Sequence, residues 1–447
     1  MTEPRNVSQN VVVLGGGLAG VACAHRLGDE GVGVTLVDRN DYHQFQPLLY
    51  QVATSQLPAE DIARPHRVIF RAHPTVEVRT ADVAKVDVAK LSLTLSDGET
   101  VSGSHLVIAA GAQPEYFGVP GAAEHAFPLY SVSDAERLRI HLQNLVRAVS
   151  DSDLDDDALD VVVVGGGPTG VEIAGALTEL MAALAAMGRI PRAGRITLVD
   201  RGSNLLGAFS DKSHQYAHKR LTKQGAEPRL DTGVASVHAD RVELDDGTSI
   251  PTRTVIWGGG ESAAPVVQAT AGLKTGRGGR VDVLPDLTVE GHPRVYAVGD
   301  AANIPTAQGA TLPQLGSVAQ QSGLWAAGNI LRERNGQPTQ PFHYKDKGIM
   351  AMIGRNAAVA EVGKHRHQVD GPVAFAAWLG VHAMLLSGAH SKADAFLSWA
   401  WDYFDRDHAA IVEWSATPKR IAWGDDAADV PHISVDRGDS TTTAGSS

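Results

Sequence analysis

A short glycine-rich segment near the start of the chain combines residue types that bind the pyrophosphate of a dinucleotide. It follows the apolar run Val11–Leu14, and its glycines have the spacing GxGxxG: Gly15, Gly17 and Gly20. In such a turn the first glycine permits a tight bend, the second lets phosphates approach the backbone, and the third lets the following helix pack on the strand. The start of that helix offers free N–H groups to the phosphates.

An acidic residue follows this turn at the distance expected for a ribose ligand. Asp38 ends a second apolar run at 34–37 and lies 38 − 20 = 18 residues beyond Gly20. A carboxylate at the end of that strand accepts hydrogen bonds from ribose hydroxyls. A glycine turn alone is a weak signal, because structural turns use the same residues. Strand, helix, second strand and acid together favour a nucleotide site.

The whole arrangement recurs 165 − 15 = 150 residues later in the chain. The glycines and the acid of the second copy follow apolar runs at 161–164 and 196–199; they are Gly165, Gly167, Gly170 and Asp200. Two complete copies predict an α/β fold with two Rossmann-like dinucleotide-binding domains. A chain that holds two dinucleotides most simply passes hydride from a nicotinamide to a flavin.

The acid of the second copy also bears on the choice of nicotinamide. A carboxylate at Asp200 accepts a hydrogen bond from the ribose 2′-hydroxyl of NADH and repels the 2′-phosphate of NADPH. The neighbouring Arg201 weakens this preference, because an arginine there can bind that phosphate. We expect NADH as the donor.

Length, charge and cysteine content exclude several classes of protein. The 447 residues suffice for about two to four domains, and the formal net charge of −12 argues against a nucleic-acid partner. Cys23 is the single cysteine, which excludes a disulfide, a redox-active dithiol and cysteine-ligated metal centres. The 18 histidines show no metal-ligand spacing, so we expect no metal site. The polar N-terminus does not resemble a signal peptide, which favours the cytoplasm.

Four further segments add to the two glycine turns: residues 41–54 with the sequence DYHQFQPLLYQVAT, 109–111, 257–260 and 295–300. With these segments the sequence resembles the type II NADH dehydrogenases over roughly residues 11–420. Members of that family are single-chain, FAD-containing NADH:quinone oxidoreductases that pump no protons. The long and unusual 41–54 segment makes a chance match a poor explanation.

The resemblance implies which residues hold each dinucleotide. In this family the first glycine turn binds FAD, and the second turn, on an inserted domain, binds NADH. Asp300 in the pair Gly299–Asp300 resembles a contact to the ribityl chain of FAD, and the alternative is an acid that caps the next helix. Gln46, Pro47 and Gly111 are implied as further FAD contacts, the first two near the isoalloxazine ring.

Three residues are implied in the redox reaction itself. Glu172, in the first turn of the second fingerprint helix, resembles a residue at the junction of nicotinamide and flavin, where its charge would help to order the two sites. The alternative is a glutamate that complements the helix dipole. Gln320 belongs to a segment that resembles the quinone site, and Lys347 to one near the flavin and the quinone; a capping glutamine and a surface lysine are the alternatives. The family usually carries a second glutamine where this chain has Gly316, which leaves the acceptor in question.

The chain is expected to divide into three regions and a tail. Residues 11–121 and 261–331 form a discontinuous FAD domain, and residues 161–260 form the NADH domain inserted between them. A linker helix over 133–150, opened by a capping box that starts at Ser133, precedes the insert. Residues 341–420 form a C-terminal region, and residues 423–447 lose periodicity, which predicts a disordered tail.

The C-terminal region has a residue pattern typical of a membrane contact. Apolar and aromatic residues recur there at helical spacing: Phe375, Trp378, Leu379, His382, Leu385 and Leu386, then Phe396, Trp399, Ala400, Tyr403 and Phe404. Neither run is long enough to span a bilayer, and such stripes also occur in cores and dimer interfaces. With the family resemblance they predict a helix pair on the membrane surface and a homodimer interface nearby.

The sequence therefore predicts a peripheral NADH:quinone oxidoreductase at the cytoplasmic face of the cell membrane. It would use FAD and NADH and reduce a quinone of the menaquinone or ubiquinone type in a respiratory chain. One alternative is a soluble NADH-dependent flavoprotein that reduces a ferredoxin-like carrier. The other is a redox-sensing protein that binds nucleotides and turns over slowly.

Overall fold

A six-stranded sheet forms around the first glycine turn. The computed structural model describes residues 10–306, 309–363 and 366–385. Its apolar, β-branched runs form buried parallel strands, and β1 (Val11–Leu14) is buried along its whole length. The order is β21-β22-β9-β1-β2-β5, with β2 (Val34–Asp38), β5 (Val76–Thr80), β9 (His105–Ile108), β21 (Thr288–Val289) and β22 (His292–Ala297). β21 pairs antiparallel to β22, and the other neighbours are parallel.

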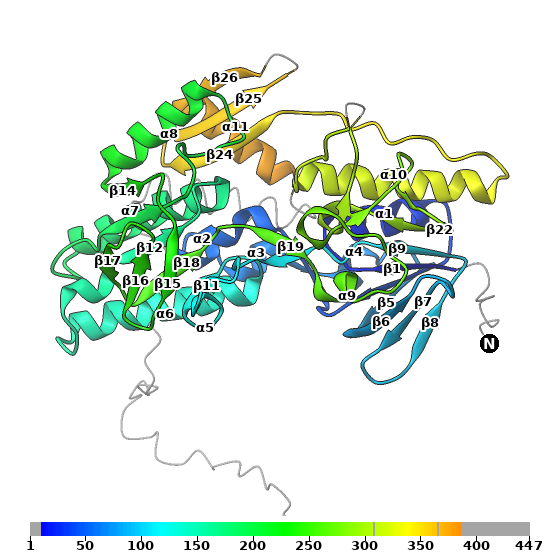
Figure 1. The fold of residues 1–447 in the computed structure, drawn as a ribbon, viewed down its shortest axis with the longest axis horizontal. Coiled ribbons are helices and arrows are strands. Elements are labelled where there is room, and N and C mark those ends of the chain that lie inside the picture. The colour runs from blue at the N-terminus through cyan, green and yellow to red at the C-terminus, as the bar shows by residue number, and fades with distance from the viewer. Residues whose placement is uncertain (1–9, 307–308, 364–365, 386–447) are drawn as a thin grey trace, which may run out of the picture. The chain divides into compact units, whose positions relative to one another are not determined.

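Helices α1 (Leu18–Asp29) and α10 (Gly316–Arg334) pack against each other beside this sheet (Figure 1). They approach closely because position 323 has no side chain: a Cβ atom on Gly323 would lie 2.1 Å from the carbonyl oxygen of Ala19. Residues from both predicted segments of the FAD domain, 11–121 and 261–331, thus share this sheet and its helices.

A second sheet, with five parallel strands, forms around the second glycine turn. Its order is β11-β18-β12-β13-β14, with β11 (Ala126–Pro128), β12 (Val161–Val164), β13 (Ile196–Val199), β14 (Ala226–Arg229) and β18 (Thr254–Trp257). Helices α7 (Pro168–Ala186) and α8 (Asp211–Gln224) pack against its strands. β11 precedes the range 161–260 predicted for this domain, so the sheet begins earlier in the chain than its fingerprint.

The linker helix, α6 (Val132–Ser150), starts with a different cap from the predicted one. Ser131 is its N-cap, and the Ser131 hydroxyl oxygen accepts the Asp134 N–H (3.1 Å) while an Asp134 carboxylate oxygen accepts the Ser131 N–H (2.9 Å). The predicted capping box at Ser133 is therefore wrong. The reciprocal pair begins at Ser131 because that residue has the extended backbone that an N-cap requires.

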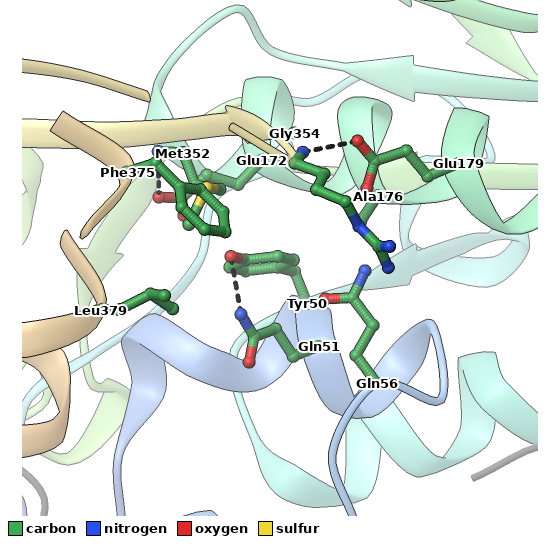
Figure 2. Close-up of a pocket in the computed structure, with 11 residues that line it drawn as sticks. Tyr50, Gln51, Gln56, Glu172, Ala176, Glu179, Met352, Gly354, Phe375 and Leu379 are labelled. Atoms are coloured by element: carbon green, nitrogen blue, oxygen red, sulfur yellow. Dashed lines mark hydrogen bonds between the residues drawn. The ribbon is translucent and has the colours of Figure 1, made fainter. Parts of the chain in front are cut away.

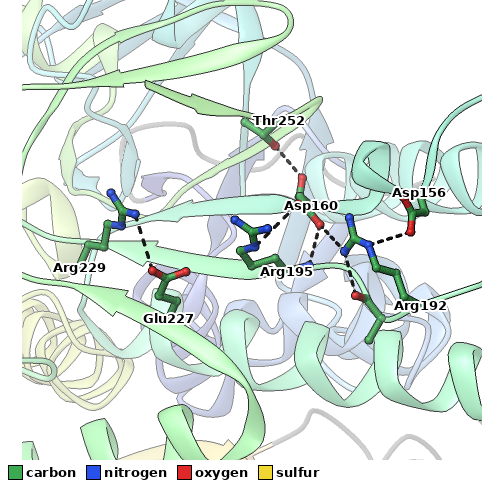
Figure 3. A network of polar contacts seen from close by, with 8 residues as sticks. Asp156, Asp160, Arg192, Arg195, Glu227, Arg229 and Thr252 are labelled. Carbon is green, nitrogen blue, oxygen red and sulfur yellow. Dashed lines mark hydrogen bonds and ion pairs between the residues drawn. The ribbon is translucent and has the colours of Figure 1, made fainter. Parts of the chain in front are cut away.

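A network of ion pairs stabilises the second sheet at the amino ends of its strands (Figure 3). Arg192 pairs with Asp156 (2.8 Å) and with Asp160 (2.9 Å), the residue before β12. Arg195, the residue before β13, donates its backbone N–H to Asp160 (2.8 Å). The glycine turn lies at the opposite, carboxyl end of these strands, so this network is structural. The acidic loop 151–157 takes part in it through Asp156.

A small antiparallel sheet and a helix complete the described chain. The sheet consists of β24 (Ile349–Gly354), β25 (Ala357–Val362) and β26 (His367–Asp370), and α11 (Gly371–Leu385) follows it. β24 packs directly on α7, where a Cβ atom on Gly175 would lie 2.0 Å from the carbonyl oxygen of Ile353. The second aromatic run, residues 396–404, and the predicted tail, residues 423–447, lie outside the described residues.

Shorter elements fill the connections between these sheets. Two of the connections contain small antiparallel sheets, β6-β7-β8 and β15-β16-β17. The bounds of the shorter elements are β3 (Tyr42–Gln44), α2 (Leu49–Ala53), α3 (Ala59–Ile62), β4 (Ala63–Pro65), α4 (His66–Ile69), β6 (Val83–Asp87), β7 (Ser92–Leu95), β8 (Thr100–Ser102), β10 (Ala112–Pro114), α5 (Ala122–His125), β15 (Val234–Val237), β16 (Arg241–Leu244), β17 (Ser249–Pro251), β19 (Glu261–Ala263), α9 (Pro265–Gln268), β20 (Val281–Asp282) and β23 (Ala302–Asn303).

Candidate active site

The two glycine turns share one backbone geometry. Gly15 and Gly165, the first glycine of each turn, have φ angles of +101° and +108°, in the region that favours glycine. At the third glycines, Gly20 and Gly170, a Cβ atom would lie 1.8 Å from the carbonyl oxygen of Gly15 or Gly165. Each helix therefore lies directly against its turn, in the way the spacing predicts.

The middle glycines of the two turns face open space. No described atom lies within 4 Å of the place where a Cβ atom would stand on Gly17 or Gly167. Each of these glycines is the N-cap of its helix, α1 or α7, and no side chain caps either helix. The N–H groups of the first turn and the positive end of the helix dipole are therefore accessible. This arrangement suits a pyrophosphate.

Asp38 and Asp200 stand beside the two turns in equivalent positions. One carboxylate oxygen of each accepts the N–H of the residue between the first two glycines, Gly16 or Gly166, at 2.5 Å. The other oxygen accepts the backbone N–H of the residue two positions after the acid, which is Asn40 for Asp38 (2.7 Å) and Gly202 for Asp200 (2.5 Å). These bonds fix both acids where a ribose would lie. Arg201, the residue that weakens the preference for NADH, is exposed.

Two buried histidines adjoin the first turn, and the sequence analysis missed both. Nδ1 of His43 lies 3.0 Å from the carbonyl oxygen of Gly16. The ring of His66 is fully buried, and neither of its nitrogens has a hydrogen-bond partner among the described residues. Burial lowers the pKa of both histidines, so both are neutral near pH 7. His66 carried no sequence signal, because only the fold brings α4 to the turn.

The further residues implied in FAD binding gather around Tyr130. Nε2 of Gln46 donates to the carbonyl oxygen of Tyr130 (3.2 Å), and a Cβ atom on Gly111 would lie 3.2 Å from the Tyr130 hydroxyl oxygen. Burial and the carboxyl groups of Glu261 and Asp300 raise the pKa of Tyr130, which places both acids near its phenol. The sequence analysis missed Tyr130, because it lies outside every recognised segment.

Asp300 has the properties of a contact to a sugar chain. It lies in the short 3₁₀ helix η5 (Gly299–Ala301), where Gly299 has a φ of +63° and donates its N–H to the Ser322 hydroxyl on α10 (3.0 Å). Oδ1 of Asp300 is buried without a hydrogen-bond partner in the described part of the chain. Burial raises its pKa to about 6. A buried oxygen of this kind requires a donor, and the hydroxyls of a ribityl chain would supply one. Pro47 lies in another short 3₁₀ helix, η2 (Gln46–Leu48).

Glu172 lies where four elements meet. It belongs to α7, and its Oε1 accepts the backbone N–H of Met352 on β24 (3.1 Å). Tyr50 of α2 and Phe375 and Leu379 of α11 line the same small cavity, of about 50 Å³ (Figure 2). Glu172 is half-buried and lines this cavity too. The C-terminal region therefore packs over the fingerprint helix of the second domain, which no local sequence pattern indicates.

Glu172 is an uncharged acid at neutral pH. Burial raises its pKa to about 8, although hydrogen bonds from the Met352 backbone and the Trp378 side chain lower it. Burial and the nearby Glu172 also raise the pKa of Tyr50 well above its ordinary value. The surrounding protein therefore favours the protonated form of Glu172, and its predicted role between the two nucleotides stays a prediction.

Gln320 lies on α10 in the wall of a second cavity, of about 340 Å³. Leu18, His43 and Arg64 also line this cavity, which places it beside the first nucleotide turn. Gly316, at the position where the resembled family usually has glutamine, begins α10 and packs on Leu18. A Cβ atom there would lie 3.0 Å from Leu18 Cδ1. A larger side chain at this position would displace Leu18 from the cavity wall.

Lys347 is exposed and lines neither cavity. Its chain segment is tied to α10 by Gln321, whose side chain donates to the Lys345 carbonyl oxygen (3.1 Å) and accepts the Lys345 N–H (3.0 Å). The structure thus brings Glu172 and Gln320 to cavities and leaves Lys347 at the surface. Its catalytic role stays a prediction.

The apolar run on α11 has two of its residues in the protein interior. Trp378 is fully buried and His382 is 8% exposed, and their rings stack with centroids 3.8 Å apart. Burial lowers the pKa of His382 to about 4, so it is neutral at pH 7. These two side chains therefore face the protein rather than a membrane. The exposed residues of the helix are all apolar: Pro372, Val373, Ala376, Ala377, Gly380, Met384 and Leu385.

Comparison with known proteins places the chain in a family. A family model described as pyridine nucleotide-disulphide oxidoreductase matches residues 9–323. The chain is 35% identical to the type II NADH:quinone oxidoreductase NdhA of Mycobacterium tuberculosis, over 90% of this chain and 89% of the relative. It is 29% identical to a type II NADH:quinone oxidoreductase of Staphylococcus epidermidis, over 79% of this chain and 90% of that protein.

Solved structures show the same fold at lower identity. NDH2 from Plasmodium falciparum, solved in complex with NADH, superposes with a TM-score of 0.80 at 17% identity, covering 89% of this chain and 99% of that one. The sulfide:quinone oxidoreductase of Aquifex aeolicus superposes with a TM-score of 0.71 at 18% identity, covering 89% and 96%.

The two sheets with their glycine turns define a pyridine nucleotide-disulphide oxidoreductase fold with two dinucleotide sites. Within this class, the chain belongs to the type II NADH:quinone oxidoreductase family. The predicted fold class and family are thereby confirmed. The open middle glycines, the uncapped helices and the unpaired Asp300 oxygen fit FAD in the first domain and NADH in the second.

Replacing each middle glycine by alanine tests this assignment within one chain. Both positions are open, so neither Gly17→Ala nor Gly167→Ala disturbs the protein itself. A methyl group against a bound pyrophosphate costs at least about 1.4 kcal/mol, which is roughly tenfold in affinity. We expect Gly17→Ala to lose bound FAD, and Gly167→Ala to keep FAD and raise the KM for NADH about tenfold. Flavin content and steady-state kinetics measure both effects, and the reverse pattern would exchange the two sites.

Proposed function

We propose that this protein oxidises NADH and reduces a membrane quinone without pumping protons, as an electron donor to a respiratory chain. The observation that carries the proposal is the pair of complete dinucleotide turns, each open at its middle glycine, in a chain of this family. Family membership also favours quinone over a ferredoxin-like carrier or a sensing role. Cys23 is buried, and burial raises its pKa to about 12, so it offers no redox-active thiolate.

Bound FAD supplies the redox chemistry, since a flavin can accept hydride from NADH and return electrons to a quinone. The chain binds and orients the two nucleotides through backbone N–H groups, helix dipoles and carboxylates. The FAD contacts in this proposal are Gly15, Gly17, Gly20, Asp38, Gln46, Pro47, Gly111, Gly299 and Asp300. The NADH contacts are Gly165, Gly167, Gly170 and Asp200.

Glu172 holds a proton close to the redox centre. Reduction of a quinone to a quinol consumes two protons, and hydride transfer from NADH brings only one. An acid with a pKa of about 8 is protonated at pH 7 and can release its proton without a large energetic cost. Tyr50 beside Glu172 is also protonated, so it adds no charge to the surroundings of Glu172. In this proposal Glu172 holds and supplies the second proton that quinol formation requires.

Gln320 binds the electron acceptor from the wall of the larger cavity. A side-chain amide can donate a hydrogen bond to a quinone carbonyl oxygen. The apolar part of that wall, which includes Leu18, Val21 and Leu324, suits the ring and the isoprenoid chain of a menaquinone or ubiquinone.

The exposed face of α11 contacts the membrane at its cytoplasmic surface. This 15-residue helix is too short to span a bilayer, and its exposed residues are all apolar. Among the described residues, α7 alone passes a length and hydropathy test for spanning a membrane, and 61% of the tested window is buried inside the protein. We propose peripheral attachment through α11, with a homodimer interface in the same region.

An anaerobic reduction experiment tests the electron path. We expect NADH to bleach the flavin absorbance of the FAD-loaded protein rapidly, and a short-chain quinone to restore it rapidly. Stopped-flow absorbance measures both steps. Bleaching without recovery would contradict the quinone as acceptor and keep the NADH and FAD sites. Absence of bleaching by NADH would contradict the donor.

Replacing Glu172 by glutamine tests its protonation. The folded-state pKa of about 8 lies above the ordinary value of 4.5, so ionisation disfavours the folded protein increasingly as pH rises from 4.5 through 8. We expect wild-type stability to fall over this range relative to Glu172→Gln. We also expect the wild-type turnover number to fall above pH 8, and that of the variant to be low and independent of pH there. Chemical unfolding and quinone reduction at several pH values measure these trends.

Glu179→Gln is the matched control, since Glu179 lies on the same helix, lines the same cavity and accepts the Arg355 N–H (2.6 Å). It should keep the wild-type pH dependence of turnover. A wild-type profile in Glu172→Gln would reduce Glu172 to a structural residue.

Charged substitutions on α11 test the membrane contact. Val373 is 69% exposed and Met384 is 72% exposed. Burial of such side chains contributes about 1.5–3 kcal/mol each, so Val373→Glu with Met384→Glu should weaken vesicle binding at least roughly tenfold. Ile140→Glu, at an exposed apolar position on α6, should bind like wild type. Co-sedimentation with lipid vesicles measures binding, and equal partitioning of all three proteins would exclude α11 as the anchor.

A further inference from the structure

Three potential metal ligands gather at the C-terminal end of α1. His25 and Asp29 lie one turn apart on the helix, and His73 reaches them from the loop before β5. His25 Nδ1 lies 3.3 Å from one Asp29 carboxylate oxygen, and His73 Nε2 lies 2.9 Å from the other. The ligand atoms of all three residues lie within 4.8 Å of one another. Sequence spacing did not indicate this cluster, because the histidines are 73 − 25 = 48 residues apart.

The cluster has nearly the geometry of a zinc site. Zinc bonds of about 2.0–2.2 Å in a tetrahedron separate neighbouring ligand atoms by about 3.3–3.6 Å. His25 and Asp29 have side chains that are 48% and 45% exposed, so small rotations can bring them to this spacing. His73 is 11% exposed and packs edge-on against Phe70, and a Cβ atom on Gly28 would lie 3.0 Å from its ring. One ligand is therefore already fixed in place.

The electrostatic surroundings of the cluster favour a cation. Asp29 is the last residue of α1, where the free carbonyl groups give the helix end a negative partial charge. A carboxylate at this end is unfavourable unless a positive charge compensates it. The neighbouring Arg26 pairs with Glu30 (2.9 Å). Two imidazoles and one carboxylate form a donor set typical of zinc and similar divalent transition metals, whereas Mg²⁺ and Ca²⁺ prefer oxygen ligands.

We propose that His25, Asp29 and His73 form a binding site for a divalent transition metal, zinc by its geometry, and that the bound ion restricts the neighbouring cavity. His25 lines the 340 Å³ cavity that also contains Gln320. A bound ion fixes the His25 ring at the wall of this cavity and adds its own water ligands there. The restriction rests on the proposed function, in which an electron acceptor uses this cavity, but the metal site itself does not.

Zinc titration of tag-free, FAD-loaded protein tests the site. We expect one tight zinc ion per chain by isothermal titration calorimetry and by metal analysis after dialysis. His25→Gln and Asp29→Asn change exposed side chains and should weaken binding at least about tenfold each. His218→Gln, at an exposed histidine of α8, should bind zinc like wild type. Flavin content and melting temperature verify that each variant is folded.

Two results would overturn the metal site. Absence of tight zinc binding to the wild-type protein would show that the three residues form only a hydrogen-bonded ion pair. Equal binding in wild type, His25→Gln and Asp29→Asn would place the zinc elsewhere. Neither result depends on quinone reduction, so failure of the proposed function leaves this test intact.

A second measurement tests the effect on the cavity. We expect zinc to slow the reoxidation of the flavin by a short-chain quinone in wild type and in His218→Gln, but not in His25→Gln. Bleaching by NADH should stay unchanged in all three proteins, because it uses the second nucleotide turn. Unchanged reoxidation of wild type with zinc bound would overturn the restriction of the cavity.

Discussion

The contact between the third glycine and the first carbonyl group of each nucleotide turn is the constraint on which both sites depend. At Gly20 and Gly170 a Cβ atom would lie 1.8 Å from that oxygen, so only a hydrogen atom fits. The contact sets each helix directly on its turn and directs the free N–H groups of the helix at the open middle glycine. It also brings the turn within reach of Asp38 or Asp200. Any larger residue at either third position would move the phosphate site and the ribose site together.

Close packing of the C-terminal region extends this arrangement to the chemistry. Gly175, also without a side chain, lets β24 lie against the second fingerprint helix, and this places the Met352 N–H on the carboxyl group of Glu172. Phe375 and Leu379 of α11 line the same cavity as Glu172. Burial by these elements raises the pKa of the acid and favours its uncharged form. A residue with the ordinary role of complementing a helix dipole thus has a raised pKa because of its surroundings.

Four side chains beside the first turn and the smaller cavity share one property, which is that burial favours their uncharged forms. His43 and His66 beside the first turn are neutral because their pKa values are lowered, and Glu172 and Tyr50 are neutral because theirs are raised. At the turns themselves the carboxylates of Asp38 and Asp200 accept backbone N–H groups, and the uncapped helix starts stay open to phosphates. Neutral surroundings also suit an apolar acceptor such as a quinone. The charged residues that form ion-pair networks, such as Arg192 with Asp156 and Asp160, lie at the other end of the second sheet.

The two nucleotide turns, their acids, the α/β class and the family could be predicted from residue order alone, because each turn is a local strand–turn–helix pattern in which residue order decides the geometry. The sequence did not determine the cap at Ser131, which depends on where the backbone changes from extended to helical. Nor did it determine the edge strand β11 or the burial of Trp378 and His382, which depend on how distant segments pack. It also missed His66, Tyr130 and the cluster around Asp29. The tertiary structure decided the state of Glu172, whose partner Met352 is 352 − 172 = 180 residues away. A protonation state follows from the surrounding protein, and contacts between such distant residues exist only after the chain has folded.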